Sequence, residues 1–165
     1  MHVKRIFSGE LLRRERARPG SEFGELIERT CVAGNIVPAE ITCALLHRAM
    51  DDSGSGNFLI DGFPRNEDNL TTWGREMGEK ARVLFVLFLD CDEATCIERC
   101  LHRGAGRSDD NLESLKKRFV TYAGKTMPIV EHYRRLGLVR DVDARGTPDE
   151  VFEAVREIFD AAKDL

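Results

Sequence analysis

Two runs of apolar residues stand out along the chain because neither alternates with polar residues. They are FLI, which ends at Asp61, and VLFVLFL, which ends at Asp90. Strands that are covered on both faces of a parallel sheet have this continuous pattern, so residues 58–61 and 83–90 are predicted as buried strands. Residues 3–7 and 138–142 are predicted as two shorter strands.

The segments between these runs have helical patterns. Residues 9–18 end at a Pro-Gly pair, and Ser21 is predicted to cap the next helix, which stops at Gly34. Further helices are predicted over 38–50, 91–103, 112–137 with a break or kink at Pro128, and 148–165 with one apolar face. Strands that alternate with helices favour an α/β fold with a parallel sheet, helices on both faces, and ligands bound beyond the carboxyl ends of the strands.

The composition fits one soluble globular domain over residues 1–165, with 42% hydrophobic and 33% charged residues. No apolar run approaches the roughly 18 residues of a membrane span, and the first ten residues hold no signal-peptide core, so no membrane partner is expected. The net charge of −4 argues against a nucleic-acid partner. The five cysteines show no CxxC pair and no zinc spacing, which favours reduced thiols in a cytoplasmic protein, with a nuclear pool allowed.

The first candidate for chemistry is the turn that follows the strand at 58–61. A carboxylate at Asp61 would lie at the binding edge of the sheet and could reach a hydrated Mg²⁺. Gly62 lets the backbone approach a ligand, Pro64 stiffens the turn, and Arg65 lies beside the predicted anion site. Two ordinary readings stand beside these: Asp61 as a turn residue or helix cap, and Arg65 as half of a surface ion pair.

The arginines make the chemical reading more specific. The chain has 19 arginines and 6 lysines, and arginine binds phosphate through two parallel hydrogen bonds. Codon bias and solvated faces could account for the excess alone. However, five further arginines gather at the ends of predicted elements: Arg13, Arg99, Arg103, Arg107 and Arg118. Phosphoryl transfer needs such residues, because its barrier falls by positioning and by neutralising the phosphate oxygens.

Several motifs together resemble the nucleoside monophosphate kinases of the adenylate kinase group. They are GELLR (9–13), FGELIE (23–28), GNIVP (34–38), DGFPRNEDN (61–69) and GRSDDN (106–111). DGFPR is specific for the group, and the RNxDN continuation points to its UMP-CMP kinases. The resemblance covers nearly the whole chain, and it implies a three-layer P-loop-kinase-type fold with a parallel sheet, NMP-binding helices within 8–50 and a short lid at 103–111.

The resemblance also implies roles for individual residues. ATP, with Mg²⁺ held indirectly by Asp61 through water, would donate the phosphoryl group to CMP or UMP, with deoxy-CMP as a further candidate acceptor. The enzyme is expected to be a monomer. The monophosphate site would contain Arg13, Asn35, Ile36, Val37, Gly62, Phe63, Pro64, Arg65 and Asn69, with Asn69 reading the pyrimidine. Arg99 and Gly146 would contact the adenine of ATP. The catalytic residues would be Arg103, Arg107 and Arg118, which converge on the phosphates, and Arg103 would also bind ATP.

One family feature has no counterpart in this sequence. The group begins with a strand and a glycine-rich loop of the form GGPGxGKGT, whose amides and lysine hold ATP phosphates. No GxxxxGK motif occurs in the chain, and Phe7-Ser8-Gly9 replaces the family's Ser-Ala-Gly. The missing strand would lie between the strands at 58–61 and 83–90, so these are expected to pair directly or to leave a gap filled by another segment. A catalytically impaired nucleotide-binding protein and a truncated gene product are therefore the alternatives to an active kinase.

Overall fold

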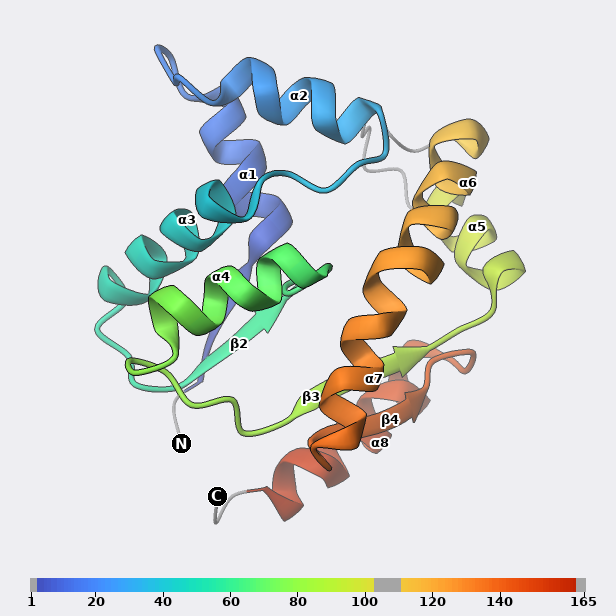
Figure 1. Cartoon of the computed structure of the whole chain (residues 1–165). Helices are drawn as coiled ribbons and strands as arrows, with labels where there is room; N and C mark the ends of the chain where they lie inside the picture. The colour runs from blue at the N-terminus through green and yellow to red at the C-terminus, as the bar shows by residue number, and fades with distance from the viewer. Residues whose placement is uncertain (1–2, 103–110, 163–165) are drawn as a thin grey trace.

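The computed structural model describes residues 3–102 and 111–162 (Figure 1). It contains four parallel-paired strands: β1 (Lys4–Phe7), β2 (Phe58–Asp61), β3 (Val86–Asp90) and β4 (Val139–Asp143). β1 pairs in parallel with β2, and β3 pairs in parallel with β4. The predicted α/β fold with parallel strand pairing is confirmed.

The four strands form two separate two-stranded sheets. In the part of the chain that the structure describes, β2 is not hydrogen-bonded to β3, so the expected direct pairing is wrong, and no described strand pairs with both of them. The prediction that these strands are buried is also wrong. Phe58 and Ile60 of β2 are only partly buried, and Leu89 of β3 is 50% exposed. A strand becomes covered on both faces only when its neighbours extend the sheet around it.

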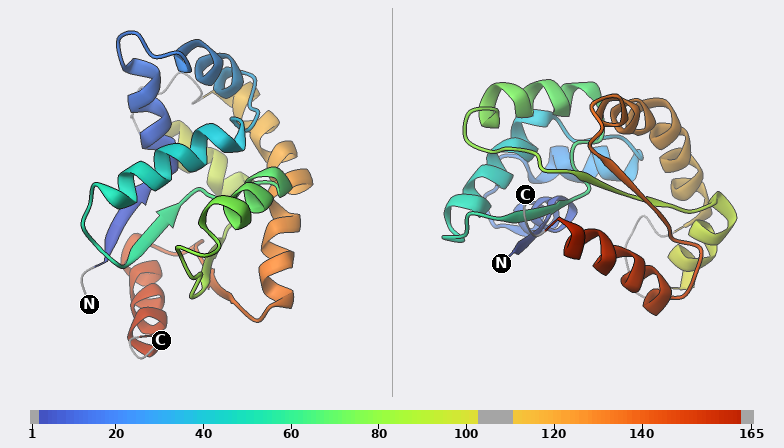
Figure 2. Two further views of the ribbon diagram at one scale, coloured as in Figure 1. Left: turned by 60° about the vertical axis from the view of Figure 1, so that its left-hand side comes forward. Right: turned by 90° about the horizontal axis from the view of Figure 1, so that it is seen from below.

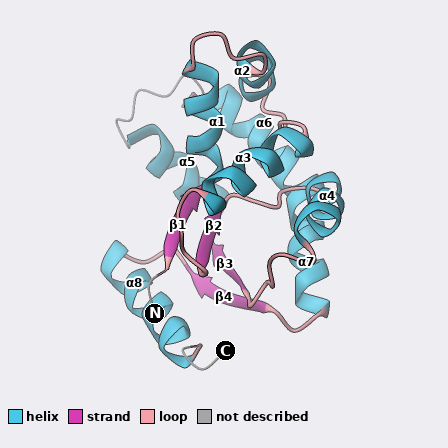
Figure 3. Ribbon diagram, turned by 90° about the vertical axis from the view of Figure 1, so that its left-hand side faces the viewer, coloured by secondary structure: helices cyan, strands magenta, loops and turns pink. Residues whose placement is uncertain are grey.

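Helices surround the strands on two sides (Figures 2 and 3). They are α1 (Ser8–Ala17), α2 (Gly24–Val32), α3 (Ala39–Asp51), α4 (Glu67–Met77), α5 (Glu93–His102), α6 (Leu112–Thr121), the π-helical turn η1 (Tyr122–Thr126), α7 (Met127–Arg135) and α8 (Pro148–Ala161). α4 and α7 lie on one side of the strands and α8 on the other (Figure 2). No described helix is both long and apolar enough to span a membrane.

The best-packed core belongs to the β1–β2 half of the molecule. Ile6 of β1, Leu46 of α3, and Trp73 and Met77 of α4 form one buried cluster, with the ring of Phe63 5.6 Å from that of Trp73. A second buried cluster, Ile27, Val37 and Ile41, joins α2 to the start of α3. These two clusters fix the turn after β2 and the loop before α3, the two segments expected to bind the monophosphate.

Most predicted boundaries agree with the structure to within two residues, and three features differ in ways that have a physical reason. β3 begins at Val86 rather than residue 83. Ser21 does not cap α2, which begins at Gly24; its hydroxyl instead accepts from the Phe23 N–H at 3.2 Å and donates to Glu15. The predicted break at Pro128 is a π-helical turn that ends just before it, so the helical path continues into α7. Proline has no N–H to donate to the preceding turn, and a wider turn accommodates this loss.

Candidate phosphate and nucleotide site

The turn after β2 is held by the first residue of α1. The buried Ser8 hydroxyl donates to the backbone carbonyl of Asp61 at 2.8 Å. Gly62 has a φ of +79°, and a Cβ atom there would lie 3.0 Å from the Ser8 Oγ. Both the conformation and the space therefore require glycine at this position. The Ser8 hydroxyl therefore ties the DGFPR turn to the start of α1 at the carboxyl ends of β1 and β2.

Arg65 is the central cation of this turn. Its backbone N–H donates to Asn69 Oδ1 at 3.1 Å, and its carbonyl accepts from the Thr126 hydroxyl at 2.8 Å. Burial, and then the positive charge of Arg118, lower the pKa of the Arg65 guanidinium. Among the described residues Arg65 has no ion pair, so the surface-ion-pair reading is wrong.

Two cations that repel each other in a partly desolvated position favour the binding of an anion between them. The fall in the Arg65 pKa is caused chiefly by burial and secondarily by repulsion from Arg118, and both disfavour the charged guanidinium. A phosphate group would reverse the sign of the local electrostatics and form charge-assisted hydrogen bonds with the guanidinium. Arg65 and Arg118 are therefore candidate phosphate-binding residues at the carboxyl end of β2 and on α6.

Asn69 supplies an unused donor beside Arg65. The side chain is only 2% exposed, its Oδ1 accepts from the Arg65 N–H, and the Asn66 side chain caps α4 by accepting from the Asn69 N–H at 2.8 Å. The Asn69 Nδ2 is buried and has no hydrogen-bond partner in the described part of the chain. An unpaired buried donor is costly, so its retention favours a ligand that accepts the bond.

The loop at 34–38 is held against α6 and η1. The Thr121 hydroxyl donates to the Gly34 carbonyl at 3.2 Å, and a Cβ atom on Gly34 (φ +71°) would lie 3.1 Å from the Lys117 Cβ. Of the three loop residues predicted to line the site, Asn35 is exposed, Ile36 is partly buried and the Val37 side chain is buried at 4% exposure. The Val37 side chain therefore belongs to the core.

Two threonines on the α6–η1 segment were not predicted from the sequence. Thr121 bonds the Gly34 loop and Thr126 bonds the carbonyl of Arg65, so one helical segment connects both predicted monophosphate-binding segments. The structure thus brings Arg65, Asn69 and Arg118 to one region, whereas Arg13 is exposed on α1. A threonine in a helix has no sequence signal that distinguishes such a contact from an ordinary surface position.

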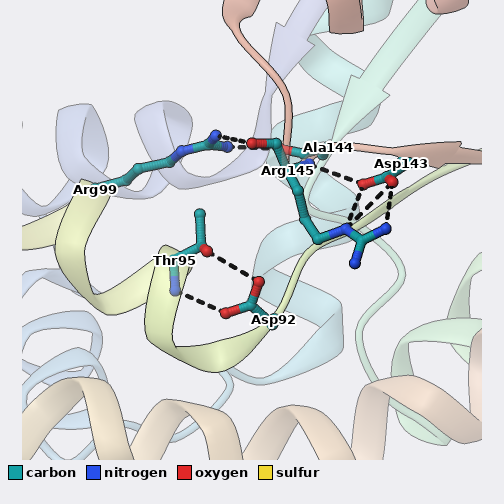
Figure 4. Close-up of polar contacts among 6 residues, drawn as sticks. All are labelled: Asp92, Thr95, Arg99, Asp143, Ala144 and Arg145. Atoms are coloured by element: carbon teal, nitrogen blue, oxygen red, sulfur yellow. Dashed lines mark hydrogen bonds and ion pairs between the residues drawn. The ribbon is translucent and has the colours of Figure 1, made fainter.

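A second region forms where α5 meets the loop between β4 and α8 (Figure 4). The Arg99 guanidinium donates to the carbonyls of Ala144 at 2.6 Å, Arg145 at 2.8 Å and Gly146 at 2.8 Å. Arg99 and Gly146, the two residues predicted near the adenine, are therefore in direct contact. Arg145 is held in turn by the Asp143 carboxylate, whose pKa it lowers to about 2.

The remaining predicted residues concern the lid and the metal. Arg103 and Arg107 lie outside the described residues. Asp61 presents an exposed carboxylate at the end of β2, and this carboxylate has no hydrogen bond or ion pair within residues 3–102 and 111–162. It is available to a hydrated Mg²⁺, which keeps most of its waters and needs few protein carboxylates. The described residues hold no group of three potential metal ligands, so a dedicated protein-only metal site is not found among them.

These observations describe an α/β protein with candidate phosphate-binding residues at the carboxyl ends of parallel strands. A family model described as adenylate kinase matches residues 1–138. The chain is 57% identical to "UMP-CMP kinase 2" of Caenorhabditis elegans over 95% of this chain and 83% of that protein. It is 59% identical to the "UMP-CMP kinase" of Gallus gallus and 54% identical to that of Homo sapiens, in both cases over 94% of this chain and 83% of the relative. The chain belongs to the adenylate kinase family and is a nucleoside monophosphate kinase of that family.

Proposed function

We propose that this protein transfers a phosphoryl group from ATP to CMP or UMP, with deoxy-CMP as a further acceptor, in pyrimidine nucleotide synthesis. The observation that carries the proposal is Arg65, a largely buried guanidinium that faces the charge of Arg118 and has no acid partner among the described residues. A phosphorylated substrate supplies the missing negative charge. The names of the relatives at 54–59% identity support pyrimidine monophosphates as the acceptors.

The proposed roles divide the site into two ends. At the acceptor end, Arg13 and Arg65 bind the monophosphate's phosphate, the backbone of residues 35–37 and of 62–65 lines its pocket, and Asn69 Nδ2 donates to the base. At the donor end, Arg99 positions the Gly146 loop against the adenine of ATP. Residues 8–50 then form the monophosphate-binding region of a single domain, and residues 103–111 form the lid.

Catalysis in this arrangement needs no strong protein base. An oxygen of the bound monophosphate attacks the γ-phosphorus of ATP in line, the bond from that phosphorus to the ADP oxygen breaks, and ADP leaves with the bonding electrons. Arg118, with Arg103 and Arg107 from the lid, neutralises charge on the transferring group. Mg²⁺, when bound near Asp61 through water, supplies further neutralisation of phosphate oxygens. A monomer in a reducing compartment such as the cytosol is consistent with five free cysteines.

A second candidate is a nucleotide-binding protein without turnover. The specific observation in its favour is that the 165 residues contain no GxxxxGK sequence, the loop that cradles ATP phosphates in many kinases. In this case the acceptor end still binds a monophosphate, because Arg65 and Asn69 do not depend on that loop. Binding and turnover must therefore be measured separately.

The test combines turnover with binding on the chain of 165 residues. ATP-dependent formation of the diphosphate is measured with CMP, UMP and AMP offered separately, and calorimetry measures the binding of each monophosphate. The proposal predicts turnover with CMP and UMP that exceeds turnover with AMP. Binding of CMP without any turnover supports the second candidate, and a folded protein that neither binds nor turns over CMP contradicts both.

One pair of variants tests Arg65 itself. Arg65→Met is expected to lower kcat/KM for CMP by about 10³, the cost of losing one phosphate-binding arginine. Its unfolding temperature is expected to stay the same or rise, because the substitution removes a buried cation beside Arg118. The matched control is Arg75→Met, which removes an arginine that is exposed and paired with Glu76. A loss of activity in Arg65→Met no larger than in Arg75→Met contradicts the assigned role.

A further inference from the structure

Two threonines of the α6–η1 segment donate hydrogen bonds away from their own helix. A threonine in a helix commonly donates its hydroxyl to the carbonyl one turn back, as Thr30 of α2 does at 2.7 Å. Thr126 instead donates to the Arg65 carbonyl at 2.8 Å, and Thr121 donates to the Gly34 carbonyl at 3.2 Å. These bonds therefore link the helix to two segments that are distant in the sequence.

The π-helical turn η1 places both threonines on one side of the helix. Five residues of a regular α-helix would separate Thr121 from Thr126 by about 140° around the axis, at about 100° per residue. A π-helical turn takes in one more residue before it closes, and the Met127 N–H accordingly donates to the Tyr122 carbonyl. The two threonines then lie about 40° apart, as an i, i+4 pair does in an α-helix. Both are partly buried, whereas residues 123–125 between them are exposed.

Arg65 is held at both of its peptide groups. Its N–H donates to the Asn69 Oδ1 at 3.1 Å, and its carbonyl accepts from the Thr126 hydroxyl. Asn69 is itself fixed, because it is 2% exposed and its N–H donates to the Asn66 side chain. A backbone held on both sides restricts the directions in which the guanidinium can point. Less conformational entropy is then lost when a phosphate binds to it.

The same helical segment holds the loop at 34–38. Gly34 has a φ of +71°, and its carbonyl accepts from Thr121. Its backbone lies so near α6 that an added Cβ atom would be 3.1 Å from the Lys117 Cβ. At the other end of the loop, the Val37 side chain is buried in the core. The loop is therefore fixed at its start by Thr121 and near its end by Val37.

We propose that Thr126 and Thr121 are positioning residues of the monophosphate site. Thr126 fixes the direction of the Arg65 guanidinium, and Thr121 fixes the loop at 34–38. This inference rests on the proposed function, in which Arg65 binds the phosphate and the loop lines the pocket. The two threonines contribute to the affinity for CMP without contact with it, because a guanidinium and a loop that are already in place lose less freedom on binding.

The first measurement compares Thr126→Val with Thr126→Ser. Valine keeps the shape of threonine but has no hydroxyl, and serine keeps the hydroxyl. Calorimetry is expected to give a Kd for CMP that is about tenfold higher in Thr126→Val and close to the wild-type value in Thr126→Ser. Thr121→Val is expected to raise the Kd for CMP by about threefold, because it loosens the pocket wall and leaves the phosphate-binding arginine in place.

The second measurement needs no substrate. The Arg65 Nε–H signal in the ¹H–¹⁵N NMR spectrum is identified by its absence from Arg65→Met, and its heteronuclear NOE reports the rigidity of this side chain. We expect the NOE to fall in Thr126→Val and to stay the same in Thr121→Val. Thr95→Val is the control for both measurements, because it removes a threonine hydroxyl that donates to the Asp92 carboxylate at 2.9 Å, within the start of α5.

Four outcomes overturn the role of Thr126: Thr126→Val binds CMP as tightly as the wild type, the Arg65 NOE is unchanged in that variant, Thr126→Ser fails to restore binding, or Thr95→Val weakens binding equally. Wild-type affinity for CMP in Thr121→Val overturns the role of Thr121. A folded wild-type protein that does not bind CMP contradicts the proposed function instead. In that case the Arg65 NOE still decides whether Thr126 positions this side chain.

Discussion

At the scale of single residues, the turn after β2 depends on one glycine for two separable reasons. Gly62 adopts a φ of +79°, and it also leaves room for the Ser8 hydroxyl that holds the Asp61 carbonyl. Gly54, in the turn before β2, has a φ of +64° but has no atom within 4 Å of the position of an added Cβ. The two glycines together allow backbone strain and steric contact to be measured apart.

We predict that Gly62→Ala lowers the free energy of unfolding by more than Gly54→Ala. Backbone strain alone costs about 1–2 kcal/mol at a left-handed position, and this applies to both variants. Only at Gly62 must the Ser8 hydroxyl also give way. Urea unfolding measures both, and Ser8→Ala combined with Gly62→Ala tests the contact, because the steric part of the loss should disappear. Equal losses in the two single variants would contradict the prediction.

Asn69 is predicted to contribute to base recognition through its unpaired Nδ2. Asn69→Ala is expected to lower kcat/KM for CMP by roughly tenfold to a hundredfold, and to reduce the preference for CMP over AMP. Asn66→Ala is the control, since it removes the cap of α4, at about 1 kcal/mol, but leaves the Asn69 amide in place. If the ratio of CMP to AMP turnover changes equally in both variants, Asn69 acts on stability rather than recognition.

The sequence predicted the residues of this site better than it predicted their contacts. Arg65 and Asn69 were predicted from the DGFPRNEDN motif, and the structure places them in direct contact. The hydrogen bonds from Thr121 and Thr126 were not predicted, because they join residues 87 and 61 positions apart. Local motifs carry no record of such distant partners; only packing creates them.

At the scale of elements, the loop between β4 and α8 is organised from outside itself. Three consecutive carbonyls, from Ala144 to Gly146, point to one guanidinium on α5. The loop is closed at its far end by a capping box, in which Thr147 and Glu150 bond each other's backbone and side chain. Arg99 is therefore a positioning residue for the segment proposed to contact adenine.

We predict that Arg99→Lys raises KM for ATP by about tenfold with a smaller effect on KM for CMP. A lysine is a single point donor and cannot span three carbonyls as the planar guanidinium does. Amide exchange at Gly146 should quicken in the same variant, which a defect in chemistry alone would not cause. Arg156→Lys, on the exposed side of α8 and paired with Glu153, is the control. Unchanged exchange at Gly146 would show that the loop holds its shape without Arg99.

Element boundaries were predicted correctly where neighbouring residues in the sequence set them. The predictions were wrong where contacts between distant residues set the boundary. β2 was predicted at Phe58–Asp61, as observed, because Asp61-Gly62 ends the apolar run sharply. Residues 83–85 were wrongly included in β3. Their apolar side chains serve packing rather than strand pairing: the ring of Phe85 lies 5.3 Å from that of Phe159. The Ser21 cap was wrong because the Ser21 hydroxyl bonds Glu15 across the turn.

At the scale of the whole molecule, stability at high pH is expected to depend on Cys43. This thiol is buried in α3 at 3% exposure, and burial raises its pKa from 9.0 to about 11. The unfolded chain therefore releases this proton more readily than the folded chain. The neutral Cys43 thiol therefore makes its full contribution to the free energy of unfolding below pH 9. This contribution is lost as the pH rises toward and through 11.

The measurement is urea unfolding of the wild type and of Cys43→Ala between pH 8 and pH 11. We expect the wild type to lose stability more steeply, so that the difference between the two proteins narrows as the pH rises. Tyr122 and Tyr133, whose pKa values are also raised by burial, contribute equally to both curves. A difference that stays constant with pH would rule out the Cys43 contribution.

The sequence by itself determined the α/β class, the parallel pairing of strands separated by helices, and the family, because apolar periodicity and the DGFPR motif are local signals. The tertiary structure alone decided that the strands stand as two pairs with open edges, and that η1 connects the two monophosphate-binding segments. It also decided that Arg65 lies buried near Arg118. Strand neighbours, desolvation and the charge at a site all depend on which distant residues meet, and only the folded chain brings them together.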